Sequence, residues 1–378
     1  MTRTIRRPRR GAFTLVEVLV VVSILAILAA LATAAFYRVR ASQSISASEA
    51  TISKLKSGLG RKWTAVLENA NKAALSDGLI TFAGGDRDRA KVMLTYLMLK
   101  NEFPTTFPEA GVPTGSVAVS PALTARPFTT LEVPVGSAVA GVPTKVSYAA
   151  PVIEYLKKYY NGQTVTISFG NTPEDSAALF YLALTASGTR GETMTGDGLQ
   201  GQVGEVKVSI KINGQEPTQP LSLSAYIDAW GSPISFSRQT YLPELDGGEY
   251  SKVKPVPAGR PLAGSTLRDP LDLQGKLLTF DLANPSPTWT PVKLAQFWAG
   301  LFPGDSKHWD YGGFPATYQV TPQPTNNNPN GPFAVSNWQP AIISAGANKK
   351  LATAAGANFG GDDDLISVRM AREGNKGN

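Results

Sequence analysis

Cysteine is absent from this chain of 378 residues, and histidine occurs once, at His308. Without thiols the protein can form neither a disulfide framework nor a thiolate metal site. A single histidine argues against a Ser-His-Asp catalytic centre and against a histidine-rich zinc site. If the folded part is exported, its loops must be held by something other than disulfide bonds.

Basic clusters are lacking beyond the first ten residues, although the net charge is +7. Subtracting the five leader arginines from +7 leaves +2 for the remainder, and no other segment has a comparable basic run. The sequence therefore provides no electrostatic surface for nucleic acid. Arginines beside an apolar span instead hold that side of the span in the cytoplasm. The five are Arg3, Arg6, Arg7, Arg9 and Arg10.

Signatures of catalysis are missing as well. The chain has no Gly-x-Ser-x-Gly, P-loop, His-Glu-x-x-His or EF-hand sequence. Residues Gly196 to Gly201 fit Gly-x-Gly-x-x-Gly in form, but a predicted strand follows them where a phosphate site requires a helix. Residues Asp86 to Arg89 are predicted to be a solvated helix start. Residues His308 to Tyr311 are predicted to be a packed loop, with a binding surface as the alternative. We therefore do not expect an enzyme.

A long apolar run lies near the N-terminus. It extends over 20 residues, from Val18 to Tyr37, and ends at Arg38. A helix of this length covers about 30 Å, the thickness of a bilayer core. Ser23 and Thr33 interrupt the run, and each can return a hydrogen bond to the helix backbone. The run predicts a single membrane span that is apolar on every side.

The segment that joins the leader to this run reads Arg9-Arg10-Gly11-Ala12-Phe13-Thr14-Leu15-Val16-Glu17. Glu17 is its most informative residue, because a carboxylate in hydrocarbon is costly and persists mainly with a partner or a function. A cleavable secretory signal would explain the basic leader, the apolar run and Ala-x-Ala at residues 30–32 or 32–34. A simple signal anchor would explain the span. Neither interpretation gives Glu17 a purpose.

The same segment resembles the N-terminus of type IV pilins and of type II secretion pseudopilins. The resemblance implies that a leader peptidase cuts at the cytoplasmic face, that the new N-terminus is methylated, and that the apolar helices pack together in a filament. Glu17 would then neutralise the terminal amine of a neighbouring subunit and fix the register between them. We favour this interpretation over the signal peptide and the simple anchor.

The resemblance leaves two bonds open for the cut. Cleavage after Gly11 keeps the glycine that is usual in the family, but it makes Ala12 the first residue and Glu17 the sixth. Cleavage after Ala12 makes Phe13 the first residue and Glu17 the fifth, which is the family spacing. The second bond is slightly favoured, since the geometry of the amine and the carboxylate depends on that spacing.

The expected fold class is α+β, with a long N-terminal helix packed on an antiparallel β-sheet head. Residues 1–12 form a basic leader, 13–69 a transmembrane and stalk helix, 70–202 a helical and loop insertion, and 203–378 a β-rich pilin-like head. An apolar stripe marks the buried face of the stalk, and Gly58 and Gly60 favour a bend or break in it. The stripe comprises Ile45, Ile52, Leu55, Leu59, Trp63 and Val66.

Local patterns predict the elements of the head. Residues 86–99 form a helix, and residues 103–150 form loops with short strands. The sequence Thr172-Pro173-Glu174-Asp175 starts a buried helix, with a capping hydroxyl, an early proline and acids at the positive end of the dipole, and Gly188 ends it. Alternation over 206–212 and 221–227, on either side of Asn213-Gly214, predicts an antiparallel hairpin. Residues 234–236, 341–344 and 365–368 predict further strands, and 241–337 decorated loops.

Two C-terminal segments are similar to those of major pseudopilins. Residues Asp228 to Ile234 resemble an Asp-x-Trp-Gly-Asn-Pro stretch, and Ser344 to Gly346 with Gly360 to Ile366 resemble a loop that holds calcium. The resemblance implies calcium ligands at Asp363 and Asp364, with Asp362 third, and calcium prefers such oxygens. Asn348-Lys349 departs from the family pattern, and a solvated acidic turn is the alternative. Asp228 is alternatively expected to anchor the turn beside Trp230.

The combined expectation is a structural subunit of a type II secretion or type IV pilus-like filament. It would cross the inner membrane once, with its N-terminus in the cytoplasm and its head in the periplasm or outside the cell. The expected partners are other pilin-like subunits and the prepilin peptidase, with calcium as cofactor and no nucleic acid. Two alternatives come from other classes: an adhesin-like binding head on a pilin anchor, and a membrane-anchored periplasmic enzyme.

Overall fold

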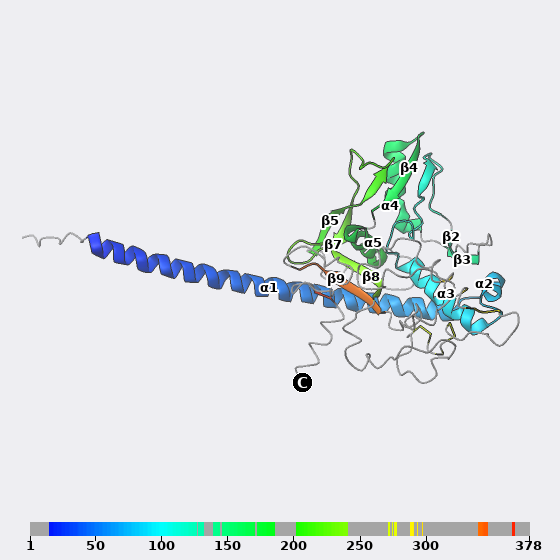
Figure 1. Ribbon diagram of the computed structural model, residues 1–378, viewed down its shortest axis with the longest axis horizontal. Helices are drawn as coiled ribbons and strands as arrows, with labels where there is room; N and C mark the ends of the chain where they lie inside the picture. Colours follow the sequence, from blue (N-terminus) through cyan, green and yellow to red (C-terminus); the bar gives the residue numbers. More distant parts are fainter. Residues whose placement is uncertain are drawn as a thin grey trace, which may run out of the picture. The chain divides into compact units, whose positions relative to one another are not determined.

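A computed structural model describes residues 15–126, 128–131, 139–143, 146–170, 172–185, 202–240, 339–346 and 365–366, with scattered positions between 271 and 297. The chain divides into two compact units, residues 1–47 and residues 48–378. The described part of the first unit is the start of helix α1 (Leu15–Lys72), and the other helices and strands belong to the second unit (Figure 1).

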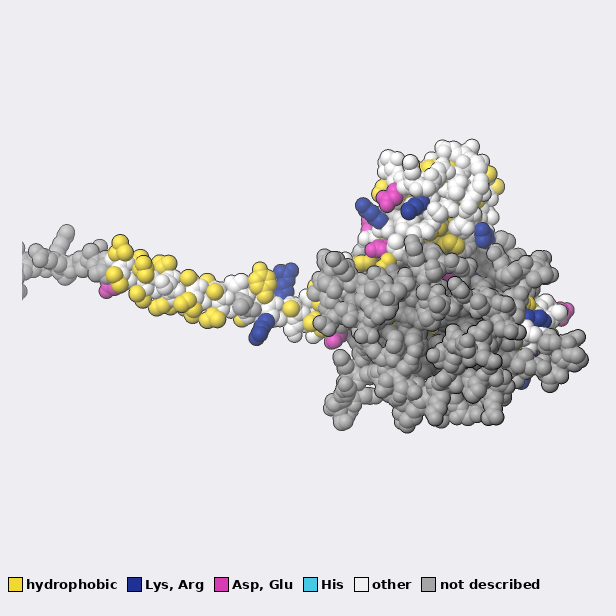
Figure 2. Space-filling view, in the orientation of Figure 1, with side chains coloured by type: hydrophobic (Ala, Val, Ile, Leu, Met, Phe, Trp, Pro, Cys, Tyr) yellow, Lys and Arg dark blue, Asp and Glu magenta, His cyan; other side chains and the backbone are white. Residues whose placement is uncertain are grey.

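Helix α1 runs for 58 residues without interruption, which confirms the predicted stalk helix. Gly58 and Gly60 lie within it, so neither glycine breaks it. Between residues 15 and 37 every described large apolar side chain is exposed, from 48% at Val20 to 81% at Leu15 (Figure 2, yellow). The two polar residues of the span behave as predicted. Ser23 Oγ donates to the Leu19 carbonyl at 2.8 Å, and Thr33 Oγ1 donates to the Ala29 carbonyl at 2.7 Å.

The second half of α1 contributes one face to the core of the second unit. Four residues of the predicted stripe are at most 3% exposed: Ile52, Leu55, Leu59 and Val66. Trp63 is partly buried, and its ring stacks on Phe103 with 5.4 Å between centroids. Ile45, the first member of the predicted stripe, lies in the first unit and is 41% exposed. The buried stripe therefore begins at Ile52.

Helices α2 (Asp77–Phe82) and α3 (Arg87–Glu102) follow α1. Asp86 caps α3, because its Oδ1 accepts hydrogen bonds from the backbone N–H groups of Asp88 at 2.9 Å and Arg89 at 3.1 Å. The predicted helix start is confirmed, but the prediction that this segment is solvated is wrong for Arg89. Its guanidinium donates to the Ala83 carbonyl at 2.7 Å and lies 4.9 Å from the centre of the Trp289 ring. A contact with an aromatic residue distant in the sequence therefore buries the charge.

Helix α4 (Val146–Tyr160) is an element that the sequence patterns did not predict. Its first residues fall within the segment that was expected to form loops, and Pro151 lies inside the helix. Proline normally disfavours a helix interior because it lacks an N–H donor. Here a buried face with spacing of four residues outweighs that cost: Tyr148, Val152 and Leu156 are at most 1% exposed.

Strand β4 (Thr164–Phe169), also unpredicted, is the central strand of an antiparallel sheet with order β1-β4-β6. Its neighbours are β1 (Gly115–Ala118) and β6 (Ile210–Ile212). In the register of this sheet Val117 lies opposite Val165, and Ile167 lies opposite Ile212. Strands β2 (Phe128–Leu131) and β3 (Val139–Pro143) form a separate antiparallel pair, which confirms short strands between residues 103 and 150.

Residues 203–227 correct the predicted hairpin. The alternating segment 206–212 is divided between β5 (Val203–Lys207) and β6, which belong to different sheets. Strand β5 pairs antiparallel with β7 (Ser222–Tyr226), so the predicted pairing is confirmed at Val206 and Lys207, whereas β6 pairs with β4. The tight turn itself is confirmed, since Asn213 and Gly214 have φ of 54° and 81° and Ile212 N donates to the Gln215 carbonyl at 2.8 Å.

The chain leaves one sheet for the other at Ser209, where helix α5 (Pro173–Thr185) holds it. The Asp175 carboxylate accepts hydrogen bonds from Ser209 N at 2.8 Å and from Thr172 N at 3.2 Å. Burial raises the pKa of Asp175 above its ordinary value of 3.8, although these hydrogen bonds favour the ionised form. A buried acceptor from a helix start thus interrupts a strand pattern that looked continuous in the sequence.

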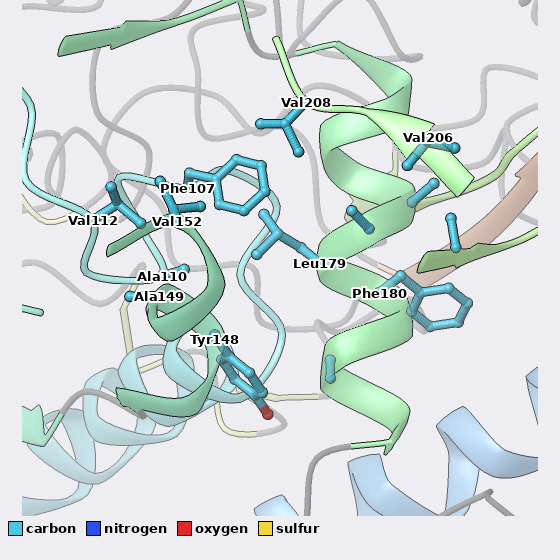
Figure 3. Close-up of a cluster of buried hydrophobic side chains, with 14 of the residues drawn as sticks. Phe107, Ala110, Val112, Tyr148, Ala149, Val152, Leu179, Phe180, Val206 and Val208 are labelled. Carbon is cyan, nitrogen blue, oxygen red and sulfur yellow. The ribbon is translucent and has the colours of Figure 1, made fainter. Parts of the chain in front are cut away.

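Helix α5 confirms the predicted buried helix, and Leu179 and Phe180 on it are completely buried. Figure 3 shows α5 side chains meeting Val206 and Val208 on one side and residues of α4 on the other. Phe180 stacks on Phe236 with a centroid distance of 4.9 Å and an interplanar angle of 6°. The main core of the second unit is therefore centred on this helix.

The C-terminal sheet has the order β10-β9-β8 and is antiparallel. It consists of β8 (Ile234–Thr240), β9 (Gln339–Ser344) and β10 (Leu365–Ile366). These strands confirm the predictions at 234–236 and 341–344 and the first half of that at 365–368. Residues 241–270 and 298–338, where decorated loops were predicted, lie outside the described residues, as does Gly188.

Candidate functional site

Glu17 lies in the first turn of α1 and is the acidic residue of that turn. Its neighbours Leu15, Val16, Val18 and Leu19 are 52–81% exposed. The positive end of the helix dipole favours a carboxylate at this point. In lipid, or between packed apolar helices, the same carboxylate is costly unless a cation joins it. Glu17, the predicted register residue, is thus an acidic residue in the first turn of an exposed apolar helix.

The surface around Glu17 requires an apolar environment. Within the described part of the chain, α1 is the helix that is long and apolar enough to cross a membrane, and an 18-residue window of it has a mean hydropathy of 2.9. None of that window is buried inside the structure. A helix that is hydrophobic all round is stable against lipid or against other apolar helices. This segment can therefore insert into a membrane or pack with copies of itself.

The predicted processing residues Gly11, Ala12 and Phe13 lie outside the described residues. The choice between the two cleavage bonds therefore remains a prediction. The predicted calcium ligands Asp362, Asp363 and Asp364 also lie outside them. Elsewhere in the described chain, no group of three or more His, Cys, Asp or Glu side chains is arranged to hold a metal ion.

The Asp228 turn, at residues 228–232, is the second predicted feature, and here the anchoring role is confirmed. Asp228 is 4% exposed. Its Oδ1 accepts hydrogen bonds from Trp230 N at 2.9 Å and Ser232 N at 2.8 Å, and its Oδ2 accepts one from Ser344 Oγ at 2.6 Å. Gly231 completes the turn with φ of 81°, a conformation that glycine adopts without strain. Trp230 itself is only partly buried, so it is not a plain core residue.

The Asp228 turn also contacts helix α1 through Ser48, the first residue of the second unit. Ala229 N donates to Ser48 Oγ at 3.0 Å, and Ser48 is completely buried. On the opposite side, Ser344 ends β9 and its backbone is paired with Leu365 of β10. The Asp228 turn thus joins the stalk helix, through Ala229 N, to the C-terminal sheet, through the Asp228 carboxylate. Sequence reasoning missed the roles of Ser48 and Ser344, because small polar residues give no periodic signal.

Comparison with known proteins bears on the N-terminus. Residues 7–33 match the family model described as the prokaryotic N-terminal methylation motif, and the match includes Gly11, Ala12, Phe13 and Glu17. No curated protein and no solved structure matches the chain. Proteins with this motif form a structural, non-enzymatic class. The chain thus carries the N-terminal signature of type IV pilins and pseudopilins, which continues into a long apolar helix.

Proposed function

We propose that this protein is a structural subunit of a type II secretion or type IV pilus-like filament. The observation that carries the proposal is Glu17 at the head of an exposed apolar helix, inside the matched methylation motif. A signal peptide or a simple anchor has no use for that carboxylate. The protein acts by polymerising, as a piston or scaffold, and its head lies outside the cytoplasm.

Assembly depends on leader removal in this proposal. The prepilin peptidase cuts after Gly11 or Ala12, which exposes a free amine that is then methylated. When the apolar helices pack in the filament, Glu17 of one subunit neutralises the amine of the next. The pair replaces two buried single charges with one neutral unit, and it fixes the axial register because breaking it leaves an unpaired charge.

Mass spectrometry of the mature N-terminus tests the processing step. A methylated Phe13 or Ala12 supports the proposal, and the identity of the residue also decides between the two bonds. A mature chain that begins near Ala34 would show that a secretory signal peptidase acts instead, and the proposal would then be wrong.

Glu17→Gln tests the register step, because it removes the charge and keeps the shape. We expect Glu17→Gln protein to reach the membrane and to be lost from filaments, as judged by electron microscopy and by cross-linking between subunits. Ser23→Ala is the matched control, since Ser23 lies in the same span and its hydroxyl donates a hydrogen bond to the Leu19 carbonyl of its own helix. Normal filaments from the Glu17→Gln protein would contradict the proposal.

We also propose that the aspartate run binds calcium, with Asp363 and Asp364 as ligands and Asp362 as the third. Support comes from the donor type, since calcium prefers carboxylate oxygens, and from the position of strand β10, which begins directly after Asp364 and pairs with Ser344. The melting temperature of the full chain should fall when calcium is chelated. Asp363→Ala or Asp364→Ala should remove that sensitivity, and a chelator-insensitive parent protein would exclude the site.

A further inference from the structure

The end of the apolar span carries a group of four residues that we call the collar: Phe36, Tyr37, Arg38 and Arg40. The two aromatic rings are 63% and 65% exposed, and their centroids lie 6.2 Å apart in an edge arrangement. Both arginines are exposed. Basic side chains (dark blue) follow the yellow part of the helix in Figure 2. The collar therefore combines apolar rings and cations within about one and a half turns of helix.

The charge of the collar is entirely positive. The segment between Glu17 and Glu49 contains no acidic residue, and the only charged residues in this segment are Arg38 and Arg40. Among the described residues, no hydrogen bond or ion pair to either guanidinium is present. Guanidinium groups bind phosphate oxygens through two parallel N–H donors. The charge of the collar thus complements an anion that carries several oxygens.

The position of the collar matches the thickness of a membrane. Glu17 and Arg38 are separated by 21 residues, which at about 1.5 Å per residue spans roughly 30 Å, the depth of a bilayer core. When Glu17 lies at one edge of the core, the collar lies at the other, at the depth of the lipid phosphates. Tyrosine and related rings favour this interface, and arginine stems can reach out to it.

The geometry of the two arginines favours lipid over a single protein partner. Residues two apart on an α-helix lie on nearly opposite sides of it. One acidic patch on a partner would meet Arg38 or Arg40, but not both. A lipid headgroup layer surrounds the helix and can contact both at once.

We propose that the collar binds the phosphate groups of anionic phospholipids at the membrane face opposite the leader, and that it sets the depth of the helix. The inference rests on the single membrane span of the proposed function. It does not depend on leader cleavage or on filament assembly. Failure of one proposal can therefore be distinguished from failure of the other.

The experiment uses the absence of cysteine, because Ser42→Cys introduces the only thiol of the chain. Ser42 is exposed and lies two residues after the collar. The full-length protein, labelled there with a small fluorophore, is placed in vesicles made of equal parts phosphatidylcholine and phosphatidylglycerol. Quenching by a spin-labelled phosphatidylglycerol is compared with quenching by a spin-labelled phosphatidylcholine. Contact quenching reports only nearby lipid, so the leader arginines, about 30 Å away across the core, do not contribute.

We expect phosphatidylglycerol to be enriched at the label by a factor on the order of a few-fold. Arg38→Gln with Arg40→Gln should abolish the enrichment, and Arg38→Lys with Arg40→Lys should keep most of it. Lys54→Gln with Lys56→Gln is the matched control, because it removes the same charge 16 residues later in the chain (54 less 38) and should change nothing. High salt should weaken the enrichment.

Equal quenching by the two lipids in the parent protein would overturn the proposal, as would an enrichment that survives Arg38→Gln with Arg40→Gln. A loss of equal size in the Lys54 and Lys56 control would also overturn it, since the effect would then come from overall charge. None of these measurements requires a cut leader or a filament. An intact lipid preference in a protein that never assembles would therefore support the collar while refuting the proposed function.

Discussion

Arg238 and Glu109 form a buried ion pair with two parallel contacts, in which Nη1–Oε2 and Nη2–Oε1 are both 3.1 Å. Both side chains are 4% exposed. Glu109 Oε2 also accepts a hydrogen bond from Thr105 N at 2.8 Å, and Arg238 Nη1 donates to the Phe103 carbonyl at 2.8 Å. The pair thereby ties strand β8 of the C-terminal sheet to the segment that follows α3.

Loss of one partner from this pair should be far more costly than loss of both. Arg238→Met leaves the Glu109 carboxylate buried without its cation, and we expect the free energy of unfolding to fall by about 3–5 kcal/mol. Arg238→Met combined with Glu109→Leu should recover much of that loss, because neither member of the pair is then left buried without the other. Urea unfolding of the full-length protein in detergent measures both.

The control for this pair is Lys211→Met, which removes an exposed cation and should change stability by less than about 0.5 kcal/mol. If the double variant is no more stable than Arg238→Met alone, the buried charge is not the cause of the loss.

The same pair should make stability depend on acid. Burial alone would raise the pKa of Glu109, but the charges of Arg238 and Lys100 and hydrogen bonds from Arg238 and Thr105 lower it from 4.5 to about 2. A lowered pKa in the folded state means that the contribution is fully present above about pH 4.5 and is lost as the pH falls towards 2. The difference in unfolding free energy between the parent and Glu109→Gln should shrink over this range.

An exposed acid provides the comparison for the pH experiment. Glu154→Gln changes a solvent-facing carboxylate on α4, and its difference from the parent should stay small at every pH. A Glu109→Gln difference that is constant from pH 7 to pH 2 would show that the pair does not hold the carboxylate ionised.

Asp228→Ala and Asp228→Asn should differ in their effect on the Asp228 turn. Alanine leaves three donors without their acceptor, of which Ser232 N and Ser344 Oγ are buried and Trp230 N is partly buried, so we expect a loss of at least about 2 kcal/mol. Asparagine keeps Oδ1 for the two N–H groups, and its amide can donate to Ser344 Oγ, so the loss should be smaller. Thermal unfolding of the full chain gives the order, and equal losses would contradict the anchoring role.

Gly84 and Gly85 provide a matched pair in the turn between α2 and α3. Both have positive φ, 72° and 85°, so alanine at either position costs about 1–2 kcal/mol. A Cβ at Gly84 would also lie 2.8 Å from the Thr288 carbonyl oxygen, whereas nothing lies within 4 Å of one at Gly85. Gly84→Ala should therefore lower the melting temperature more than Gly85→Ala, and the same shift in both would argue against the Thr288 contact.

Elements that depend on local signals were predicted from the sequence. The cap, early proline and acidic turn located α5, the Asn213-Gly214 pair located a tight turn, and the apolar stripe located the buried face of α1 from Ile52. In these cases the residues that decide the structure lie within a few positions of one another.

Features that depend on distant contacts were not predicted. Helix α4 was not predicted because Pro151, a residue that disfavours a helix interior, lies within it. The segment 206–212 was predicted as one strand. It is divided because Ser209 N donates to Asp175, which lies in helix α5 and is distant in the sequence. The ion pair of Glu109 and Arg238 joins residues 129 positions apart, and no local pattern marks either as paired. At the N-terminus, the short segment from Arg9 to Glu17 was sufficient to predict the methylation motif, because the motif is a local sequence pattern.

The link between Ser48 and the Asp228 turn has a consequence for how the protein is made. Ser48 and Ser344 are attached to neighbouring residues of that turn, yet 296 positions separate them in the chain (344 less 48). At roughly 5–20 residues per second, translation takes on the order of 15–60 s to cover that distance. During this interval the apolar face of α1 that starts at Ile52 has emerged, and the last residue of the core that it shares, Ile342, has not. Newly made protein should therefore need a chaperone at this stage, earlier than any contact with other subunits.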